Sequence, residues 1–155
     1  MKVGRWDIMY QESSFDPFKQ IGGGLYNNAG LKQGKWIEPD EVFYKDKKVT
    51  YNGQYNMKGK KVGSWDIMYD RMLNGEYIQM YILEIIICDF VQSGGGSYDQ
   101  VGNQKKIGRW MELYENFQYN AQVIYIGEYN QNGMKVGKWN IMFREYDEKE
   151  YEQMQ

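Results

Sequence analysis

Apolar and polar residues alternate in short segments along most of this chain, and turn residues separate the segments. Residues 48–55 and 122–129 each place Val, Tyr, Gly and Tyr at successive alternate positions. A period of two is typical of β-strands, and no helix-period stripe of useful length is present. Asn132-Gly133, between two alternating segments, is a strong hairpin signal because glycine readily adopts the positive φ that such a turn needs. The pattern predicts an all-β fold of antiparallel hairpins.

A motif that recurs five times organises these segments. Its best copy, residues 51–65, has the pattern Y-x-G-x-Y-x-x-x-G-x-K-x-G-x-W, which returns in full at residues 125–139. Weaker copies occupy residues 24–36 and 96–110, and a shortened copy occupies residues 2–6. Five copies predict a repeat protein, an elongated, solenoid-like ribbon in which each hairpin packs against its neighbours.

Two types of unit alternate along this array. DIMY or NIMF follows the tryptophan in one type, and the longer segments IEPDEVFY or MELYENFQY follow it in the other. We therefore divide the single domain 1–155 into a half unit 1–23, a unit 24–52, an enlarged unit 53–95, a unit 96–126 and a unit 127–155. The repeated positions that we expect to be structural are Trp6, Trp36, Trp65, Trp110, Trp139, Tyr26, Tyr55, Tyr98, Tyr129, Gly34, Gly63, Gly108 and Gly137.

The length of the turn decides which face of the ribbon each aromatic residue occupies. A two-residue turn at Asn132-Gly133 pairs Tyr129 with Val136 and places Trp139 on the opposite face from Tyr129. We therefore expect aromatic rows along both faces, with each ring lying over a glycine. Such ring contacts add about 0.5–1.5 kcal/mol each beyond area burial. The glycines and aromatic residues of the motif thus indicate stacking between units and not a binding site.

The enlarged unit contains the most apolar stretch of the chain, Tyr77–Val91. Asn74-Gly75 offers a further hairpin turn before it. The first interpretation is an added hairpin that buries residues 85–88. The second is a strand for self-association, because a β-branched segment of low charge pairs readily when it lies at a sheet edge. The residues of this second interpretation are Ile85, Ile86, Ile87 and Phe90.

Composition argues against most kinds of chemical site. The chain has no histidine and one cysteine, Cys88, so neither an intrachain disulfide nor a Ser-His or Cys-His catalytic pair is expected, and a zinc site is disfavoured. The glycine triplets 22–24 and 94–96 lack the context of a phosphate-binding loop, and we expect them to permit close approach of neighbouring strands. We expect no catalytic residue, no metal and no cofactor, and we predict that the protein is not an enzyme.

Basic residues recur at two motif positions but are balanced by acidic ones. The chain has 19 basic and 21 acidic residues, spread along its length, and this balance argues against nucleic acid and makes a membrane an improbable partner. The recurring cations could bind phosphates or an acidic partner. The alternative is that they are solvated strand residues whose stems cover the aromatic rings. The two sets fall on opposite faces of a regular strand, and this division favours the structural interpretation. They are Lys2, Lys32, Lys61, Lys106 and Lys135 in one set and Arg5, Lys35, Arg109 and Lys138 in the other.

The sequence also lacks the pattern of a secretory signal and of a membrane span. The N-terminal residues lack the apolar core of a secretory signal, and the longest apolar run is too short and too interrupted to span a bilayer. With a single cysteine, these features favour a cytoplasmic location.

The motif resembles a MORN-type repeat, with tryptophan in the place of the last small residue. Its G-x-K-x-G-x-W half also resembles the MORN-variant repeats of bacterial antitoxin-like proteins. The long units with GGG-x-Y and WDIMY resemble large repeat families known from ciliates. The resemblance covers nearly the whole chain, although the period of 29 to 30 residues is longer than is usual for the family. It implies an elongated array of β-hairpins that acts as a scaffold, a tether or a protein-binding surface and carries no catalytic machinery.

These observations lead to three hypotheses for function. Neither end of the chain carries a distinct capping sequence, so we expect the ends to be occupied, and the first hypothesis is a structural protein that self-assembles end to end, with a filament as the extended product. The alternative is a monomeric scaffold or adaptor that binds a protein partner through a face of the ribbon. The third hypothesis is a membrane-associated phosphoinositide binder, which the acidic balance disfavours.

Overall fold

The computed structural model describes residues 1–70, 75–83, 91–145, 148 and 150–154. These residues form thirteen strands and no helix, so the predicted all-β fold is confirmed. In the described part of the chain, nothing could therefore cross a membrane as a helix. The strands are β1 Gly4–Tyr10, β2 Lys19–Tyr26, β3 Lys32–Pro39, β4 Val49–Tyr55, β5 Lys61–Tyr69, β6 Ile78–Gln79, β7 Tyr81–Leu83, β8 Val91–Ser93, β9 Gly95–Tyr98, β10 Lys106–Leu113, β11 Ala121–Tyr129, β12 Lys135–Glu145 and β13 Glu152–Gln153.

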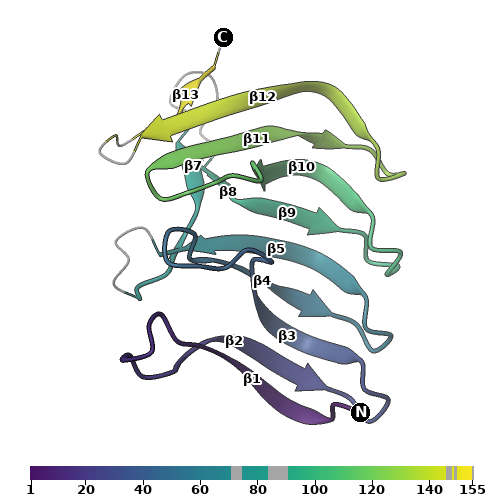
Figure 1. The fold of residues 1–155 in the computed structure, drawn as a ribbon. Helices are drawn as coiled ribbons and strands as arrows, with labels where there is room; N and C mark the ends of the chain where they lie inside the picture. Colours follow the sequence, from purple (N-terminus) through teal and green to yellow (C-terminus); the bar gives the residue numbers. More distant parts are fainter. Residues whose placement is uncertain (71–74, 84–90, 146–147, 149, 155) are drawn as a thin grey trace.

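Most of these strands belong to one open, curved sheet in which every pairing is antiparallel. Its order is β1-β2-β3-β4-β5-β9-β10-β11-β12-β13, and β6 also pairs with β5. The hairpin tips lie along one side of the sheet and the longer connections along the other (Figure 1). The order follows the sequence except where β6, β7 and β8 are inserted, as expected for hairpins that stack on their neighbours.

The register of the hairpins differs from the predicted one. Tyr129 pairs with Lys135 and not with Val136, so five residues, 130–134, form the loop where two were expected. A shift of one residue exchanges the two faces of a strand. The Trp139 ring consequently lies on the same face as Tyr129, with ring centroids 5.3 Å apart. The predicted aromatic rows on both faces are therefore wrong, because tryptophan and tyrosine share one face, which we call the ring face. The opposite face is the back face.

A polar residue at the start of each loop accounts for its length. The Asn130 side chain accepts hydrogen bonds from the backbone N–H groups of Asn132 and Met134, both at 2.9–3.0 Å. Gly133 completes the loop with a φ of 79°, so the predicted positive φ is confirmed. Side-chain caps of this kind hold the backbone in a turn. The equivalent residues in the other tips, each of which accepts at least two backbone hydrogen bonds, are Asn27, Asn56 and Asp99.

Two long loops cover part of the ring face and form the main core with it. They are residues 40–48, between β3 and β4, and residues 114–120, between β10 and β11. Phe117 is fully buried and packs edge-to-face on Tyr69 of β5, with ring centroids 5.4 Å apart. The loops also contact each other, because the backbone N–H of Tyr119 donates to the carbonyl of Asp46 at 2.9 Å. The buried hydrophobic cluster of the described residues consists of Val49, Ile67, Tyr69, Met80, Met111, Phe117, Ile124 and Ile126.

The enlarged unit adds three short strands to the array. Strand β6 pairs with the end of β5, whereas β7 and β8 pair with each other in a separate two-stranded sheet. Asn74 lies outside the described residues, and the same is true of Ile85, Ile86, Ile87, Cys88 and Phe90. Their burial and their role in self-association therefore stay predictions.

Candidate functional site

Nine aromatic rings form one continuous row on the ring face, which we call the ring ladder. Tryptophan and tyrosine alternate in it from strand to strand, and successive rings meet edge-to-face with centroids 4.9–6.3 Å apart. Edge-to-face contacts are favourable because the positive rim of one ring meets the negative face of the next. The ring ladder consists of Trp6, Tyr26, Trp36, Tyr55, Trp65, Tyr98, Trp110, Tyr129 and Trp139.

Glycine makes room for each buried tryptophan of the ring ladder. A Cβ atom built on Gly53 would lie 2.2 Å from Cδ2 of Trp65, so only glycine fits beneath that ring. Gly24, Gly96 and Gly127 support their tryptophans in the same way. The glycine two residues before each tryptophan has a different role. It bends the strand in the left-handed region, with φ of 63–69° at Gly34, Gly63, Gly108 and Gly137.

A row of lysines lies over the ring ladder, and two glutamates bind these lysines in pairs. Lys61 Nζ is 3.9 Å from the centre of the Trp65 ring and 2.9 Å from Glu38 Oε2. Lys32 forms the second ion pair with Glu38, and the hydroxyl of Tyr55 donates to Glu38 Oε1 at 2.7 Å. We call Lys32, Glu38, Tyr55 and Lys61 the Glu38 cluster. Its counterpart, the Glu112 cluster, consists of Lys106, Glu112, Tyr129 and Lys135.

The clusters hold their carboxylates in the ionised form. Burial pushes the pKa of Glu38 up, but hydrogen bonds from Lys32, Lys61 and Tyr55 outweigh burial and bring the pKa below its ordinary value. The pKa of Glu112 is lowered in the same way by its two lysines and by Tyr129, again against the effect of burial. Burial and the neighbouring carboxylate raise the pKa of Tyr55 well above its usual range, so the tyrosine stays a donor. In each cluster the carboxylate is thus satisfied by two lysines and a tyrosine, while each lysine has further N–H donors.

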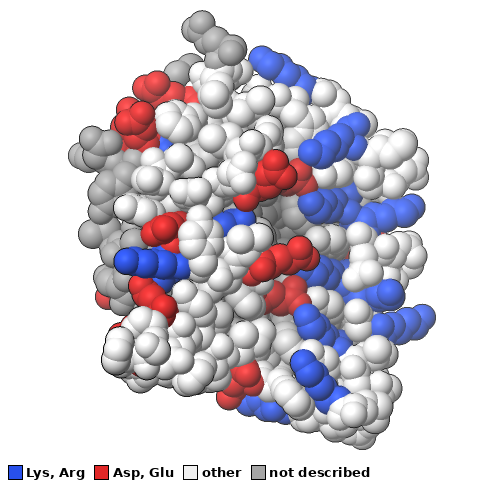
Figure 2. Space-filling view, viewed as in Figure 1, with Lys and Arg blue, Asp and Glu red and all other residues white. Residues whose placement is uncertain are grey.

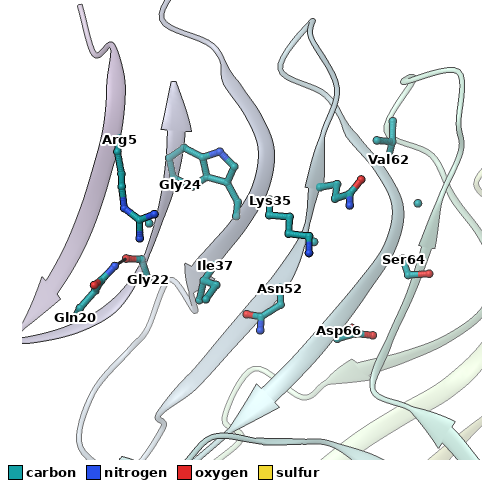
Figure 3. A pocket seen from close by; sticks show the side chains of 15 residues that line it. Arg5, Gln20, Gly22, Gly24, Lys35, Ile37, Asn52, Val62, Ser64 and Asp66 are labelled. Carbon is teal, nitrogen blue, oxygen red and sulfur yellow. Dashed lines mark hydrogen bonds between the residues drawn. The ribbon is translucent and has the colours of Figure 1, made fainter. Parts of the chain in front are cut away.

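The back face presents an open groove across the first five strands. The groove has a volume of about 680 Å³, and its lining includes Arg5, Gln20, Lys35, Asn52 and Asp66. Lys35 on β3 and Asn52 on β4 project into the same space (Figure 3). The groove offers hydrogen-bond donors, acceptors and both signs of charge within one continuous surface.

Glycine backbone forms much of the floor of this groove. Gly22, Gly23, Gly24 and Gly53 all line it. A Cβ on Gly23, whose φ is 132°, would lie 2.2 Å from the carbonyl oxygen of Trp6. The triplet is thus needed for close contact between strands, as the sequence predicted.

The charges of the groove are balanced, and they differ from those of the ring face. Arg5 pairs with Asp7 at 3.3 Å, and Gln20 donates to the same carboxylate at 2.8 Å. Burial raises the pKa of Asp66 above its ordinary value, which is opposite to the shift of Glu38. On the side of the molecule seen in Figure 2, Lys and Arg gather along the hairpin tips, whereas Asp and Glu lie toward the centre and the other side.

The sequence pointed to the ring ladder, but it left several polar positions unidentified. The structure brings the predicted tryptophans and tyrosines together on one face and places the four predicted glycines at strand bends. Glu38 and Glu112 were missed, although each stands two residues after the tryptophan of a long unit, where the other units have isoleucine. The groove residues Gln20, Asn52 and Asp66 were missed too, because only the strand pairing brings them together.

Comparison of the chain with protein-family models, with curated proteins and with solved structures found no match. Among the described residues, no group of His, Cys, Asp or Glu side chains is arranged to hold a metal ion.

Proposed function

We propose that this chain is a non-enzymatic repeat scaffold that binds an extended segment of a protein partner along the groove of the back face. One observation carries this proposal. The groove of about 680 Å³ combines amide, hydroxyl, carboxylate and cationic side chains over a glycine floor. A polypeptide main chain presents alternating donors and acceptors, and a side-chain amide such as that of the exposed Gln54 can pair with both.

The dimensions of the groove suit a short extended peptide. Five neighbouring strands span four spacings of about 4.8 Å, or roughly 19 Å, and this length accommodates roughly six extended residues at ~3.3 Å each. Charges of both signs, Arg5 and Lys35 beside Asp7 and Asp66, suit a peptide of mixed charge better than a polyanion. The resemblance of the motif to MORN-type repeats, which act as scaffolds and binding surfaces, agrees with this proposal.

A display library of random hexapeptides tests the proposal directly. We expect the purified chain to enrich a family of related sequences and to bind a synthetic representative saturably in calorimetry. Lys35→Glu, within the groove, should weaken that binding by tenfold or more, a factor that corresponds to about 1.4 kcal/mol. Lys138→Glu, at the equivalent motif position in the last unit, is the matched control and should leave the affinity unchanged. No enrichment, or an equal effect of the two substitutions, would contradict the proposal.

Self-assembly through sheet edges is a second candidate function. Within the described residues, β1 pairs only with β2, and β12 pairs with β13 only at Met142 and Phe143. The rest of each strand presents unpaired backbone groups, which can template pairing with another chain. In the antiparallel order, β1 and β12 run in the same direction, so copies related by simple translation would pair in parallel. Pairing about a two-fold axis would instead continue the antiparallel sheet.

Light scattering and negative-stain microscopy over a range of protein concentrations test this candidate. We expect a mass that rises with concentration, in steps of two chains, together with elongated particles. A uniform species with the mass of one chain at tens of micromolar would eliminate self-assembly and leave the scaffold proposal intact.

A further inference from the structure

The Glu38 and Glu112 clusters share one plan. In each, a carboxylate lies between lysines of two tryptophan-containing strands and accepts a hydrogen bond from the tyrosine of the strand between them. In the Glu38 cluster these strands are β3, β4 and β5, and in the Glu112 cluster they are β10, β11 and β12. The repeat thus shows twice which groups on the ring face bind a carboxylate.

Strands β5, β9 and β10, midway between the clusters, carry the same binding groups without the carboxylate. Lys61 and Lys106 flank Tyr98 there, as Lys32 and Lys61 flank Tyr55. Ile67 stands two residues after Trp65, in the position that Glu38 and Glu112 occupy after their own tryptophans. Within the described part of the chain, the Tyr98 hydroxyl has no hydrogen-bond partner, whereas the hydroxyl of Tyr55 donates to Glu38.

A cavity lies where the carboxylate is missing. It has a volume of about 390 Å³, and Lys61, Tyr98, Lys106 and, at one end, Glu112 line its polar side. Ile67, Met111 and Leu113 line it as well and supply apolar surface. This volume falls within the range of small-molecule sites, roughly 300–1,000 Å³.

The charges around the cavity also favour an anion. The two clusters together contain four lysines and only two glutamates. A carboxylate in the cavity would complete an alternating row of charges, from Lys32 through Glu38, Lys61, the ligand, Lys106 and Glu112 to Lys135. Besides burial, the carboxylates of Glu38 and Glu112 raise the pKa of Tyr98, which agrees with a hydroxyl that lies between the clusters and stays protonated to donate.

We propose that the cavity at Tyr98 binds a small carboxylic acid with an apolar body, whose carboxylate takes the place that Glu38 and Glu112 hold in the flanking units. Lys61, Lys106 and the Tyr98 hydroxyl bind the carboxylate, and Ile67, Met111 and Leu113 contact the apolar body. This inference goes beyond the proposed scaffold function, because it uses the ring face, and either can fail without the other.

Calorimetric titration with 3-phenylpropionate, and with the neutral 3-phenylpropanamide as control, tests the inference. The carboxylate should bind saturably and quench tryptophan fluorescence, because Trp65 and Trp110 also line the cavity. The amide should bind at least tenfold more weakly, since it offers no charge to the two lysines. No binding of the carboxylate, or equal binding of acid and amide, would overturn the inference.

Two variants assign the binding to this cavity. Tyr98→Phe should weaken the binding of 3-phenylpropionate by roughly tenfold or more, which is the expected factor for loss of a hydrogen bond to a charged group. Tyr26→Phe is the matched control, because Tyr26 holds the same motif position near the sheet edge, where Trp6 is 42% exposed. Unchanged binding to Tyr98→Phe, or an equal loss in Tyr26→Phe, would overturn the assignment.

A third variant supplies the missing carboxylate from the chain itself. In Ile67→Glu the new side chain should occupy the place of the ligand and abolish binding of 3-phenylpropionate. If this buried substitution prevents folding, the result for Tyr98→Phe decides the matter alone. A folded Ile67→Glu protein that binds the acid with undiminished affinity would contradict the proposal.

Discussion

Both faces of this sheet are built from the same repeat. They differ in how many of their polar side chains already have partners within the protein. On the ring face, aromatic rings interlock, lysines lie over them, and Glu38 and Glu112 collect hydrogen bonds from several partners. On the back face, an open groove presents amide and charged side chains that could contact a ligand. The comparison teaches that one motif can place its stabilising contacts on one side and leave the other side free for recognition.

The largest loss of stability should follow the truncation of a buried ring on the ring face. Trp65 is 3% exposed and contacts both Tyr55 and Tyr98. Trp65→Ala should therefore lower the free energy of unfolding by about 3–5 kcal/mol, as for other large-to-small changes in cores. Urea denaturation followed by circular dichroism measures this loss. Trp6→Ala, at the same motif position but 42% exposed, should cost clearly less. Equal losses would show that burial within the ring ladder does not determine the stability of the ring face.

A single methyl group beneath a ring should have the next largest effect. Gly53→Ala places a Cβ within 2.2 Å of the Trp65 ring, and overpacking of this kind costs about 1–3 kcal/mol. Ser64→Ala, an exposed change on the back face, should stay within about 0.5 kcal/mol of the parent protein. Thermal unfolding of both variants distinguishes them. A Gly53→Ala protein as stable as the parent would show that the ring ladder can shift to accommodate the methyl group.

Two tyrosines of the ring ladder should respond differently to loss of their hydroxyl groups. Tyr55→Phe removes the hydrogen bond to the charged Glu38 and should cost about 1.5 kcal/mol. Tyr98→Phe removes no hydrogen bond within the described residues, so its free energy of unfolding should change by less than about 0.5 kcal/mol. Chemical denaturation without added carboxylate is the measurement. A larger loss in Tyr98→Phe than in Tyr55→Phe would argue against the closed Glu38 cluster.

The smallest predicted effect is on the pH dependence of stability. The folded pKa of Glu38 lies below the ordinary value of 4.5, so its stabilising contribution is present above pH 4.5 and is lost as the pH falls through the folded pKa. Asp66 on the back face shows the opposite sign. Its folded pKa is raised above 3.8, so its contribution is present below pH 3.8 and is lost as the pH rises through the folded pKa.

Denaturation curves between pH 3 and pH 7 measure these contributions. Glu38→Gln should flatten the loss of stability on acidification, because this variant has no carboxylate to protonate at that position. Asp66→Asn should raise the stability near neutral pH relative to acid, since an amide avoids the cost of burying a charge. Parallel curves for the parent protein and both variants would contradict the assigned shifts.

Local chemistry allowed much of the fold to be predicted, but not its register. Alternation and the glycine at position 133 identified strands and hairpins, because these signals depend on neighbouring residues alone. The length of the tip was mispredicted because Asn132-Gly133 matches a two-residue turn, while the capping side chain of Asn130 selects a five-residue loop. That single difference moved every tyrosine relative to its tryptophan.

The binding surfaces were harder to predict because they depend on pairing between strands. Asn52 and Asp66 become neighbours only through the register of β4 and β5. Glu38 could have been identified from the alternation of glutamate and isoleucine after the tryptophans, although the distance to its lysines required coordinates. The groove could not be anticipated, because its lining residues come from five strands that only the pairing of the strands brings together.

The contact between the two long loops has a consequence for how the chain folds. In a simple repeat array each unit interacts only with its neighbours, so the ends fray and stability is nearly additive along the array. Here the hydrogen bond from Tyr119 to Asp46, and that from Lys47 to the carbonyl of Glu115 at 3.4 Å, join two units that are separated by the enlarged one. The middle of the array, β3 to β11, should therefore open as one cooperative block with uniform hydrogen-exchange protection.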